Sequence, residues 1–372
     1  MVAGGDEARG ARLVAHLEQA GYPRCHPAVL QKASIFLDTA GEDIRGRLFL
    51  TCDASGTEFC LRPELTVPVC LEYLRSPLAG QSARYSYFGP VFRIRSQTSG
   101  EFTQAGLESF GRSDHAAADA EILALALEAV ASAGGPKLTV TLGDAGLFAA
   151  MIRTLGIAPV WQRRILRGHS RGQKLATILD TAATADAADH SGVLAALEGT
   201  DKKGARALVE DLLAIAGIST VGGRTAGEIA DRFLEQAALK VDGGFPPDRR
   251  EILERFLAIA GEPDNALVQL RQLASEAHLD LGGVLEELDD RLGFISAHGI
   301  DVSSLHFSAA FARKLDYYTG FVFEARAAAT PGARPIIGGG RYDRLLASLN
   351  GGHVVPAVGA AIWMDRLMED AI

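Results

Sequence analysis

The chain has 372 residues, of which 48% are apolar and 22% are charged. This balance is typical of a globular protein and excludes a largely disordered chain. The length corresponds to roughly two to three domains. Lys and Arg number 37 and Asp and Glu number 46, so the net charge is −9, which gives no general attraction to nucleic acid or to anionic membranes. The sequence has no apolar run of roughly 18 residues and no signal-peptide pattern, so we expect a cytoplasmic protein that does not span a membrane.

The sequence lacks the common signatures of metal and nucleophile chemistry. Its four cysteines, Cys25, Cys52, Cys60 and Cys70, form no CxxC pair, so neither a zinc site nor a redox motif is indicated. The nine histidines have no metal-ligand spacing, and GxxxxGKS/T, HExxH and GxSxG are all absent. We therefore expect no metal, no cofactor and no catalytic residue of these types.

The first 142 residues read as helices and strands joined mainly by hairpins. The expected elements are, in order, a helix over 7–20, a hairpin over 47–62, a helix from Thr66, which caps it, to about Arg75, an antiparallel pair over 83–94 and 101–110, a helix over 115–133 and a strand over 137–142. Strands joined by hairpins favour an antiparallel sheet.

From residue 143 to 299 helical periodicity dominates. Helices are expected over 145–155, 160–167, 174–182, 203–215, 225–238, 248–260, 263–276 and 283–297. Strands return at 305–310, 321–325 and 357–362, with a three-glycine turn at 338–340 and a helix over 341–349 between the last two. The sequence therefore predicts an α+β fold whose core, 1–142 and 300–372, is interrupted by a helical insertion, 143–299.

Several polar residues stand within these apolar strands. Glu64, Gln104 and Glu108 offer acceptors, and Arg93 and Arg313 offer donors. Burying so many charges is costly unless they pair with each other or with a ligand. One interpretation is an internal salt-bridge network. The other is a site for a small zwitterion, whose ammonium binds the carboxylates and whose carboxylate binds an arginine.

These segments resemble the histidyl-tRNA synthetase family. The matching motifs, in order, are LRPELT (61–66), GPVFR (89–93), Gln104-x-x-x-Glu108, LDYYTG (315–320), GGGRYD (338–343) and PAVGAAI (356–362). LDYYTG is the most specific of them. The resemblance implies a class II synthetase fold, which is an antiparallel sheet flanked by helices, usually in a dimer.

The resemblance also implies a histidine site and assigns its residues. Glu64, Thr66 and Gln104 would hold the α-amino group, Arg313 the carboxylate, and Glu108 with Tyr318 the imidazole, with Tyr317 beside them. The two arginines that bind phosphate in that family correspond to Arg93 and Arg366, so a residual anion site is expected there.

The chain departs from the synthetase pattern where nucleotide and tRNA bind. Arg95 stands where a glutamate helps to hold adenine, Lys314 replaces a glycine, and Trp363 replaces a glycine that leaves room for the nucleotide. If Trp363 points inward, it fills the adenosine side of the pocket; otherwise it rotates out and packs elsewhere. The sequence ends six residues after Arg366, so we expect no anticodon-binding domain.

A chain that keeps the histidine contacts of the synthetase but lacks part of its nucleotide contacts resembles the ATP phosphoribosyltransferase regulatory-subunit family. That resemblance implies a non-catalytic chain that partners the short-form catalytic subunit. It also implies homodimers within a hetero-octamer and L-histidine as the feedback effector of the first step of histidine biosynthesis. Histidine can act in this way only if it binds one assembly state better than the other.

Two other functions stay open. The chain could be a histidine-activating ligase, which the retained arginines favour. It could also be an RNA-binding adaptor, for which the support is a basic stripe consisting of Arg163, Arg164, Arg167, Arg171 and Lys174. Gly168 and Gly172 are expected to interrupt the helix that would carry this stripe, and a solvated or partner-facing surface is the better explanation of it.

Overall fold

The computed structural model describes residues 4–39, 46–95, 99–180, 204, 207, 211–212, 215, 220–221, 224–225, 244–313, 317–330 and 332–367. The chain divides into two compact units. Unit 1 consists of Met1–Met151 and Arg255–Ile372, and unit 2 consists of Ile152–Glu254. Unit 2 is shorter than the helical region predicted over 143–299, since both ends of that region belong to unit 1. No helix within the described part of the chain is long and apolar enough to cross a membrane.

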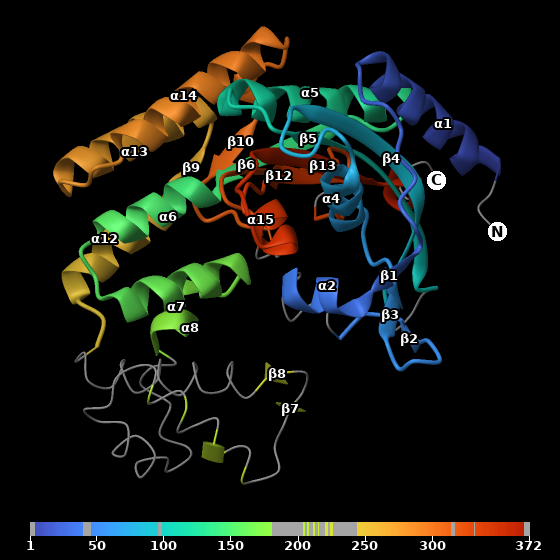
Figure 1. The fold of residues 1–372 in the computed structure, drawn as a ribbon. Helices are drawn as coiled ribbons and strands as arrows, with labels where there is room; N and C mark the ends of the chain where they lie inside the picture. The colour runs from blue at the N-terminus through green and yellow to red at the C-terminus, as the bar shows by residue number, and fades with distance from the viewer. Residues whose placement is uncertain are drawn as a thin grey trace. The chain divides into compact units, whose positions relative to one another are not determined.

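Unit 1 is built on an eight-stranded sheet (Figure 1). Its strands, in spatial order, are β4 (Ala83–Phe92), β5 (Glu101–Phe110), β13 (Ala357–Trp363), β12 (Ile337–Arg341), β11 (Phe321–Ala327), β6 (Leu138–Asp144), β10 (His306–Ser308) and β9 (Ala260–Gly261). Neighbouring strands pair antiparallel, except β6 and β10, which pair in parallel. The predicted antiparallel sheet and α+β class are therefore confirmed.

Helices cover both faces of this sheet. The described helices that lie wholly within unit 1 are α1 (Gly4–Gln19), α2 (Ala33–Thr39), α4 (Thr66–Arg75), α5 (His115–Ser132), α13 (Pro263–Glu276), α14 (Gly282–Ala297) and α15 (Leu345–Asn350). Figure 1 shows α5 and α14 along one face and α4 and α15 on the other. Tyr73 of α4 stacks on Phe110 of β5 with ring centroids 4.4 Å apart, which fixes α4 against the sheet.

Shorter elements complete the described chain. Unit 1 also holds a small antiparallel sheet of β1 (Leu30–Lys32), β3 (Glu58–Leu61) and β2 (Leu50–Cys52), in that spatial order, and two 3₁₀ turns, η2 (Val302–Ser304) and η3 (Met364–Leu367). Two helices, α6 (Ala145–Thr154) and α12 (Pro247–Ala258), cross the boundary between the units. Unit 2 contains α7 (Pro159–Ser170), α8 (Leu175–Asp180) and the paired strands β7 (Thr220–Val221) and β8 (Arg224–Thr225).

The three glycines at 338–340 form a strand and not the predicted turn. They are the middle of β12, which is buried between β11 and β13. A side chain on Gly338 would collide with the guanidinium of Arg313, and one on Gly339 with the ring of Phe323. Glycine leaves room here for the bulky side chains that lie against the strand. The helix predicted over 341–349 begins later, as α15 at Leu345.

The start of α4 also differs from the prediction. Thr66 is the first helical residue, and its neighbour Leu65 occupies the cap position without a side-chain hydrogen bond. The carboxylate of Glu64 takes the capping role, since it accepts from the backbone N–H groups of Thr66 at 2.7 Å and Val67 at 2.8 Å. Free N–H groups at a helix start favour such a negatively charged acceptor.

In unit 2, Gly168 lies inside α7 and does not interrupt it. A side chain there would meet Ile178 at 2.5 Å, so the glycine lets α8 pack closely on α7. Arg164 of the basic stripe donates to the carbonyl of Ile178 at 2.7 Å. The helices predicted over 203–215 and 225–238 lie largely outside the described residues, as does Lys314.

A buried network of charges joins α14 to the sheet of unit 1. Arg291 of α14 contacts Asp119 of α5 at 2.9 Å and Asp144 of β6 at 2.8 Å. Arg341 of β12 binds the other oxygen of Asp119 at 2.6 Å. Arg291 and Asp119 are almost fully buried, so each charge depends on its partners. These contacts tie the helix near the end of the predicted insertion to the core.

Candidate functional site

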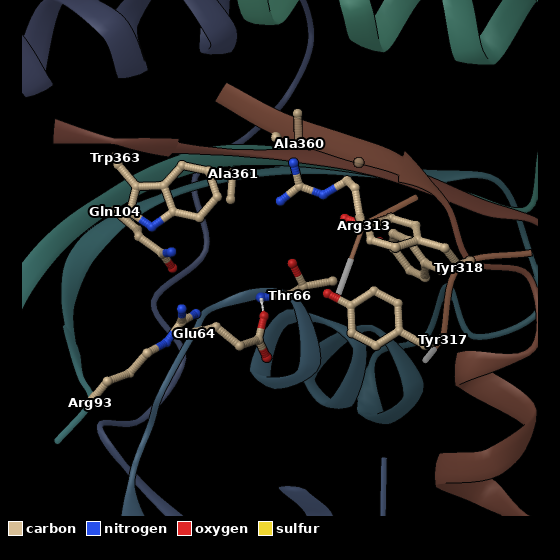
Figure 2. Close-up of a pocket in the computed structure, with 13 residues that line it drawn as sticks. Glu64, Thr66, Arg93, Gln104, Arg313, Tyr317, Tyr318, Ala360, Ala361 and Trp363 are labelled. Carbon is tan, nitrogen blue, oxygen red and sulfur yellow. Dashed lines mark hydrogen bonds between the residues drawn. The ribbon is translucent and has the colours of Figure 1, made fainter. Parts of the chain in front are cut away.

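A pocket lies in unit 1 between the start of α4 and strands β5, β12 and β13 (Figure 2). The residues that line it are Glu64, Thr66, Arg93, Gln104, Arg313, Tyr317, Tyr318, Gly338, Tyr342, Gly359, Ala360, Ala361 and Trp363. The small residues of β12 and β13 form one wall. The polar side chains come from the start of α4, from the end of β4, from β5, from the segment before β11 and from the residue after β12.

Glu64 places a buried carboxylate at this cavity. Its side chain is held by the Thr66 and Val67 N–H groups, so it is fixed before any ligand arrives. Burial raises the pKa of Glu64, while the Val67 N–H and the charge of Arg93 act in the opposite direction. Arg93 lines the same cavity, and its Nε donates to the carbonyl of Pro63 at 2.7 Å.

Glu108 lies one layer beneath the cavity and not on its lining. Its two oxygens accept from the hydroxyl of Tyr87 at 3.2 Å and from the hydroxyl of Tyr342, which does line the cavity. Burial raises the pKa of Glu108 to about 8, an effect that these hydroxyl donors partly oppose. Gly359 lies directly against Glu108, since a side chain there would overlap the carboxylate.

Gln104 and Trp363 face each other on paired strands. They are register partners of β5 and β13. Both are buried and line the cavity, and Figure 2 shows the indole nitrogen turned toward the Gln104 side chain. Within the described part of the chain, neither Gln104 Oε1 nor Trp363 Nε1 has a hydrogen-bond partner. The cavity thus presents an acceptor and a donor that are both unsatisfied.

Arg313 brings a positive charge to the wall formed by β12. Its guanidinium occupies the space above Gly338 and donates to the carbonyl of Phe323 at 3.3 Å. It lies 5.8 Å from the ring centroid of Tyr318 and 5.8 Å from that of Trp363. Its Nε is buried and has no partner among the described residues.

Three tyrosines form the remaining side of the cavity. The rings of Tyr317 and Tyr318 are 4.9 Å apart, and Tyr317 meets Tyr342 edge-on at 5.8 Å. Burial is the main cause that raises the pKa of Tyr317 and Tyr318, so both hydroxyls stay protonated at neutral pH and can donate to a ligand.

Trp363 points into the cavity. Two guanidinium groups lie near its ring, that of Arg366 at 4.4 Å and that of Arg313 at 5.8 Å from the ring centroid. Arg366 does not line the cavity, because it donates to the carbonyl of Pro335. Burial lowers the pKa of Arg366 to about 10. Arg95 forms an ion pair with Asp365 at 3.8 Å.

The structure brings most of the predicted site residues together. Those that line the cavity are Glu64, Thr66, Arg93, Gln104, Arg313, Tyr317 and Tyr318. Glu108 and Arg366 contact lining residues from behind. Tyr87 and Tyr342 were not predicted as site residues from the sequence. Tyr342 stands in the GGGRYD motif, which was a usable signal, whereas Tyr87 had none beyond its place in an apolar strand.

The arrangement suits a small zwitterion. The cavity presents acceptors on Glu64, before α4, and on Gln104 of β5, with Glu108 of β5 beneath its lining. It presents donors on Arg313 and on the Trp363 N–H. Among the described residues no group of three His, Cys, Asp or Glu side chains is placed to hold a metal ion.

Comparison with known proteins agrees with this geometry. The family model of histidyl-tRNA synthetase matches residues 6–367. The ATP phosphoribosyltransferase regulatory subunit of Brucella canis is 42% identical over 344 residues, which cover 91% of this chain and 90% of that protein.

Two solved structures share the fold. One, an ATP phosphoribosyltransferase regulatory subunit/histidyl-tRNA synthetase from Bacillus halodurans, has a TM-score of 0.69 and 20% identity, covering 98% of this chain and 78% of the other. The second, a histidine–tRNA ligase subunit from Alicyclobacillus acidocaldarius, has a TM-score of 0.58 and 26% identity, covering 98% and 92%.

The chain therefore belongs to the histidyl-tRNA synthetase family and, within it, to the ATP phosphoribosyltransferase regulatory subunits. This confirms the family predicted from the motifs and the class II synthetase-like fold. The Brucella relative is named as a regulatory and not as a catalytic subunit.

Proposed function

We propose that this chain is the non-catalytic regulatory subunit of ATP phosphoribosyltransferase. It would be required by the short-form catalytic subunit and would carry feedback inhibition by histidine in the first step of histidine biosynthesis. The supporting observation is the cavity itself, where buried acceptors and donors converge without partners for Gln104 Oε1, Arg313 Nε and Trp363 Nε1. Buried polar atoms are normally satisfied, so a ligand with both charges accounts for them.

Each part of histidine has a candidate partner in this site. Glu64, Thr66 and Gln104 would hold the α-amino group, and Arg313 the carboxylate. Glu108, with Tyr317 and Tyr318 beside it, would hold the imidazole. Contact with Glu108 requires Tyr342 to move or to relay the interaction, because its hydroxyl now covers the carboxylate.

Regulation requires more than binding. Histidine shifts an assembly between states only if it binds one of them more tightly, and the coupling acts equally in both directions. We therefore expect the catalytic partner to change the affinity of this chain for histidine within a hetero-oligomer of four regulatory and four catalytic chains. Reconstitution with a short-form catalytic subunit tests this, with phosphoribosyl-ATP formation measured with and without histidine. Activity that does not need this chain, or that ignores histidine, would contradict the proposal.

The second candidate is a histidine-activating ligase. It is favoured by Arg93, a predicted phosphate-binding arginine that still reaches the cavity. It is opposed by Trp363, which occupies the cavity, and by Arg366, which is turned onto Trp363 and Pro335. Histidine-dependent exchange between ATP and pyrophosphate separates the two functions, since a ligase catalyses this exchange steadily and the regulatory subunit does not.

A further inference from the structure

We propose that Thr319 is a positioning residue of the histidine site, because it holds in place the three tyrosines that form one side of the cavity. Those tyrosines are Tyr317, Tyr318 and Tyr342, whereas Thr319 itself does not line the cavity. The proposal rests on the histidine site proposed above and deepens it, since it names a residue outside the lining on which the lining depends.

The first argument is that Thr319 contacts the backbone on both sides of Tyr342. Its N–H donates to the carbonyl of Arg341 at 2.8 Å, and its hydroxyl oxygen accepts from the N–H of Asp343 at 3.0 Å. The same hydroxyl donates to the Arg341 carbonyl at 3.5 Å. These groups belong to the two peptide bonds of Tyr342, whose planes set its φ and ψ and so the direction of its side chain. One threonine therefore fixes the orientation of Tyr342.

The second argument is that Thr319 follows Tyr317 and Tyr318 directly in the chain. It thus joins the segment before β11, which carries these two rings, to the residue after β12, which carries the third. The rings meet across this junction, since Tyr317 lies edge-on to Tyr342 with centroids 5.8 Å apart. The Tyr318 ring lies against β12, where a side chain on Gly340 would come within 3.0 Å of it. A shift of the junction therefore moves the three rings relative to each other.

The third argument is that the backbone at Thr319 is itself anchored to the start of α6. The carbonyl of Gly320 accepts from the N–H of Ala145 at 2.9 Å. The carbonyl of Thr319 lies against Gly146, where a side chain would meet it at 3.1 Å. Because both carbonyls are held by α6, the Thr319 hydroxyl starts from a fixed place, and its hydrogen bonds pass that place on to Tyr342.

The position of Tyr342 matters because this residue connects the cavity to Glu108. Its hydroxyl donates to the Glu108 carboxylate, which is the proposed partner of the imidazole. Loss of the Thr319 hydroxyl would leave the Asp343 N–H without this acceptor and loosen the backbone of Tyr342. A site whose supporting contacts loosen binds its ligand more weakly, even when the residues that contact the ligand are unchanged.

Calorimetry of L-histidine with full-length Thr319→Val tests the proposal, because valine keeps the shape of threonine and removes the hydroxyl. We expect the dissociation constant to rise about five- to tenfold at an unchanged number of sites per chain. Thr319→Ser, which keeps the hydroxyl, should bind within about twofold of the wild type. A merely structural role would lower the number of sites, because part of the chain would be unfolded, and would leave the dissociation constant of the folded part unchanged.

The matched control is Thr139→Val. Thr139 lies on β6 of the same sheet at an exposed position, and its hydroxyl also donates to a backbone carbonyl, that of Arg326, at 3.4 Å. This control should bind histidine as the wild type does. Wild-type affinity in Thr319→Val, or equally weak binding in Thr319→Ser, would overturn the role of Thr319. Failure of the wild type itself to bind histidine would instead overturn the histidine site.

A second measurement does not depend on the folding of Thr319→Val. In the wild type, the amide proton of Asp343 exchanges with solvent when its hydrogen bond to Thr319 opens, and NMR follows the rate. If the open form does not bind histidine, a histidine concentration of about ten times the dissociation constant slows this exchange about tenfold. The same exchange rate with and without bound histidine would overturn the role of Thr319.

Discussion

The hydroxyl of Tyr342 donates to the carboxylate of Glu108 across 234 positions of sequence, and Tyr87 donates to its other oxygen. The contact joins the GGGRYD segment to β5 and covers Glu108 at the base of the cavity. It also holds the carboxylate in one orientation before a ligand binds. A prearranged acceptor of this kind loses little conformational freedom on binding.

Removal of Glu108 should weaken histidine binding. We expect Glu108→Ala to cost roughly 2 kcal/mol of binding free energy, since it strands the polar groups that the carboxylate serves. Calorimetry with L-histidine measures this, and Glu101→Ala, an exposed position on the same strand, is the control. Unchanged affinity in Glu108→Ala would mean that histidine binds elsewhere, for example at a subunit interface.

The ionisation of Glu108 should make folding stability depend on pH. Its pKa is raised to about 8 in the folded chain, against about 4.3 when unfolded, so the folded chain keeps a proton that the unfolded chain has lost. The free energy of unfolding therefore falls as pH rises toward 8, and the raised pKa of Glu64 acts in the same direction.

Urea unfolding at about pH 6.5 and about pH 8.5 tests this dependence. Glu108→Gln should show a smaller loss of stability between the two values, because it cannot ionise. The lowered pKa of His169, which burial takes to about 4, affects both proteins equally and cancels in the comparison. If the free energy of unfolding fell equally in the wild type and in the variant, Glu108 would not titrate in this pH range.

A methyl group on Gly338 should disturb ligand binding without unfolding the chain. Its Cβ would lie 1.9 Å from a terminal nitrogen of Arg313, and this flexible side-chain end can move aside. We expect Gly338→Ala to weaken histidine binding by roughly tenfold, about 1.4 kcal/mol. Gly293→Ala, which has open space around it on α14, should leave binding unchanged. Equal affinities for both variants would show that Arg313 does not contact the ligand.

The charge network under α14 should matter for stability and not for binding. Arg291→Met leaves Asp119 and Asp144 with fewer partners in a buried place, and we expect a loss of about 3–5 kcal/mol. Arg271→Met breaks an exposed ion pair to Asp289 and should cost less than about 1 kcal/mol. Denaturant unfolding compares the two. Similarly small losses of unfolding free energy in both variants would mean that solvent reaches the network.

Much of the core fold could be predicted because its signals are local. The bounds of β5 follow from the turn residues at 97–100 and those of α4 from the proline at 63 and from Thr66, and both agree with the structure. Strand β12 could not be predicted in this way. Its glycines favour a turn locally, but Arg313 and Phe323 fill the space beside them, and both contacts come from elsewhere in the chain.

The distinction between local sequence signals and long-range contacts also applies to the site. Glu64, Gln104 and Arg313 stood out as charged or polar residues next to apolar strands, and they do meet at one cavity. Arg291 gave no such signal. It lies on an amphipathic helix, where arginine is ordinarily exposed, and its partner Asp119 is 172 positions away. The covering of Glu108 by Tyr342 likewise depends on a long-range contact.

Histidine sensing by this cavity is tested most directly by the histidine inhibition curve of the reconstituted complex. Wild-type chain and Glu108→Gln are each combined with a short-form catalytic subunit, and phosphoribosyl-ATP formation is measured against histidine concentration. If the cavity is the histidine sensor, the half-inhibiting concentration rises at least about tenfold in the variant. The same half-inhibiting concentration in both complexes would contradict the central claim that this cavity senses histidine.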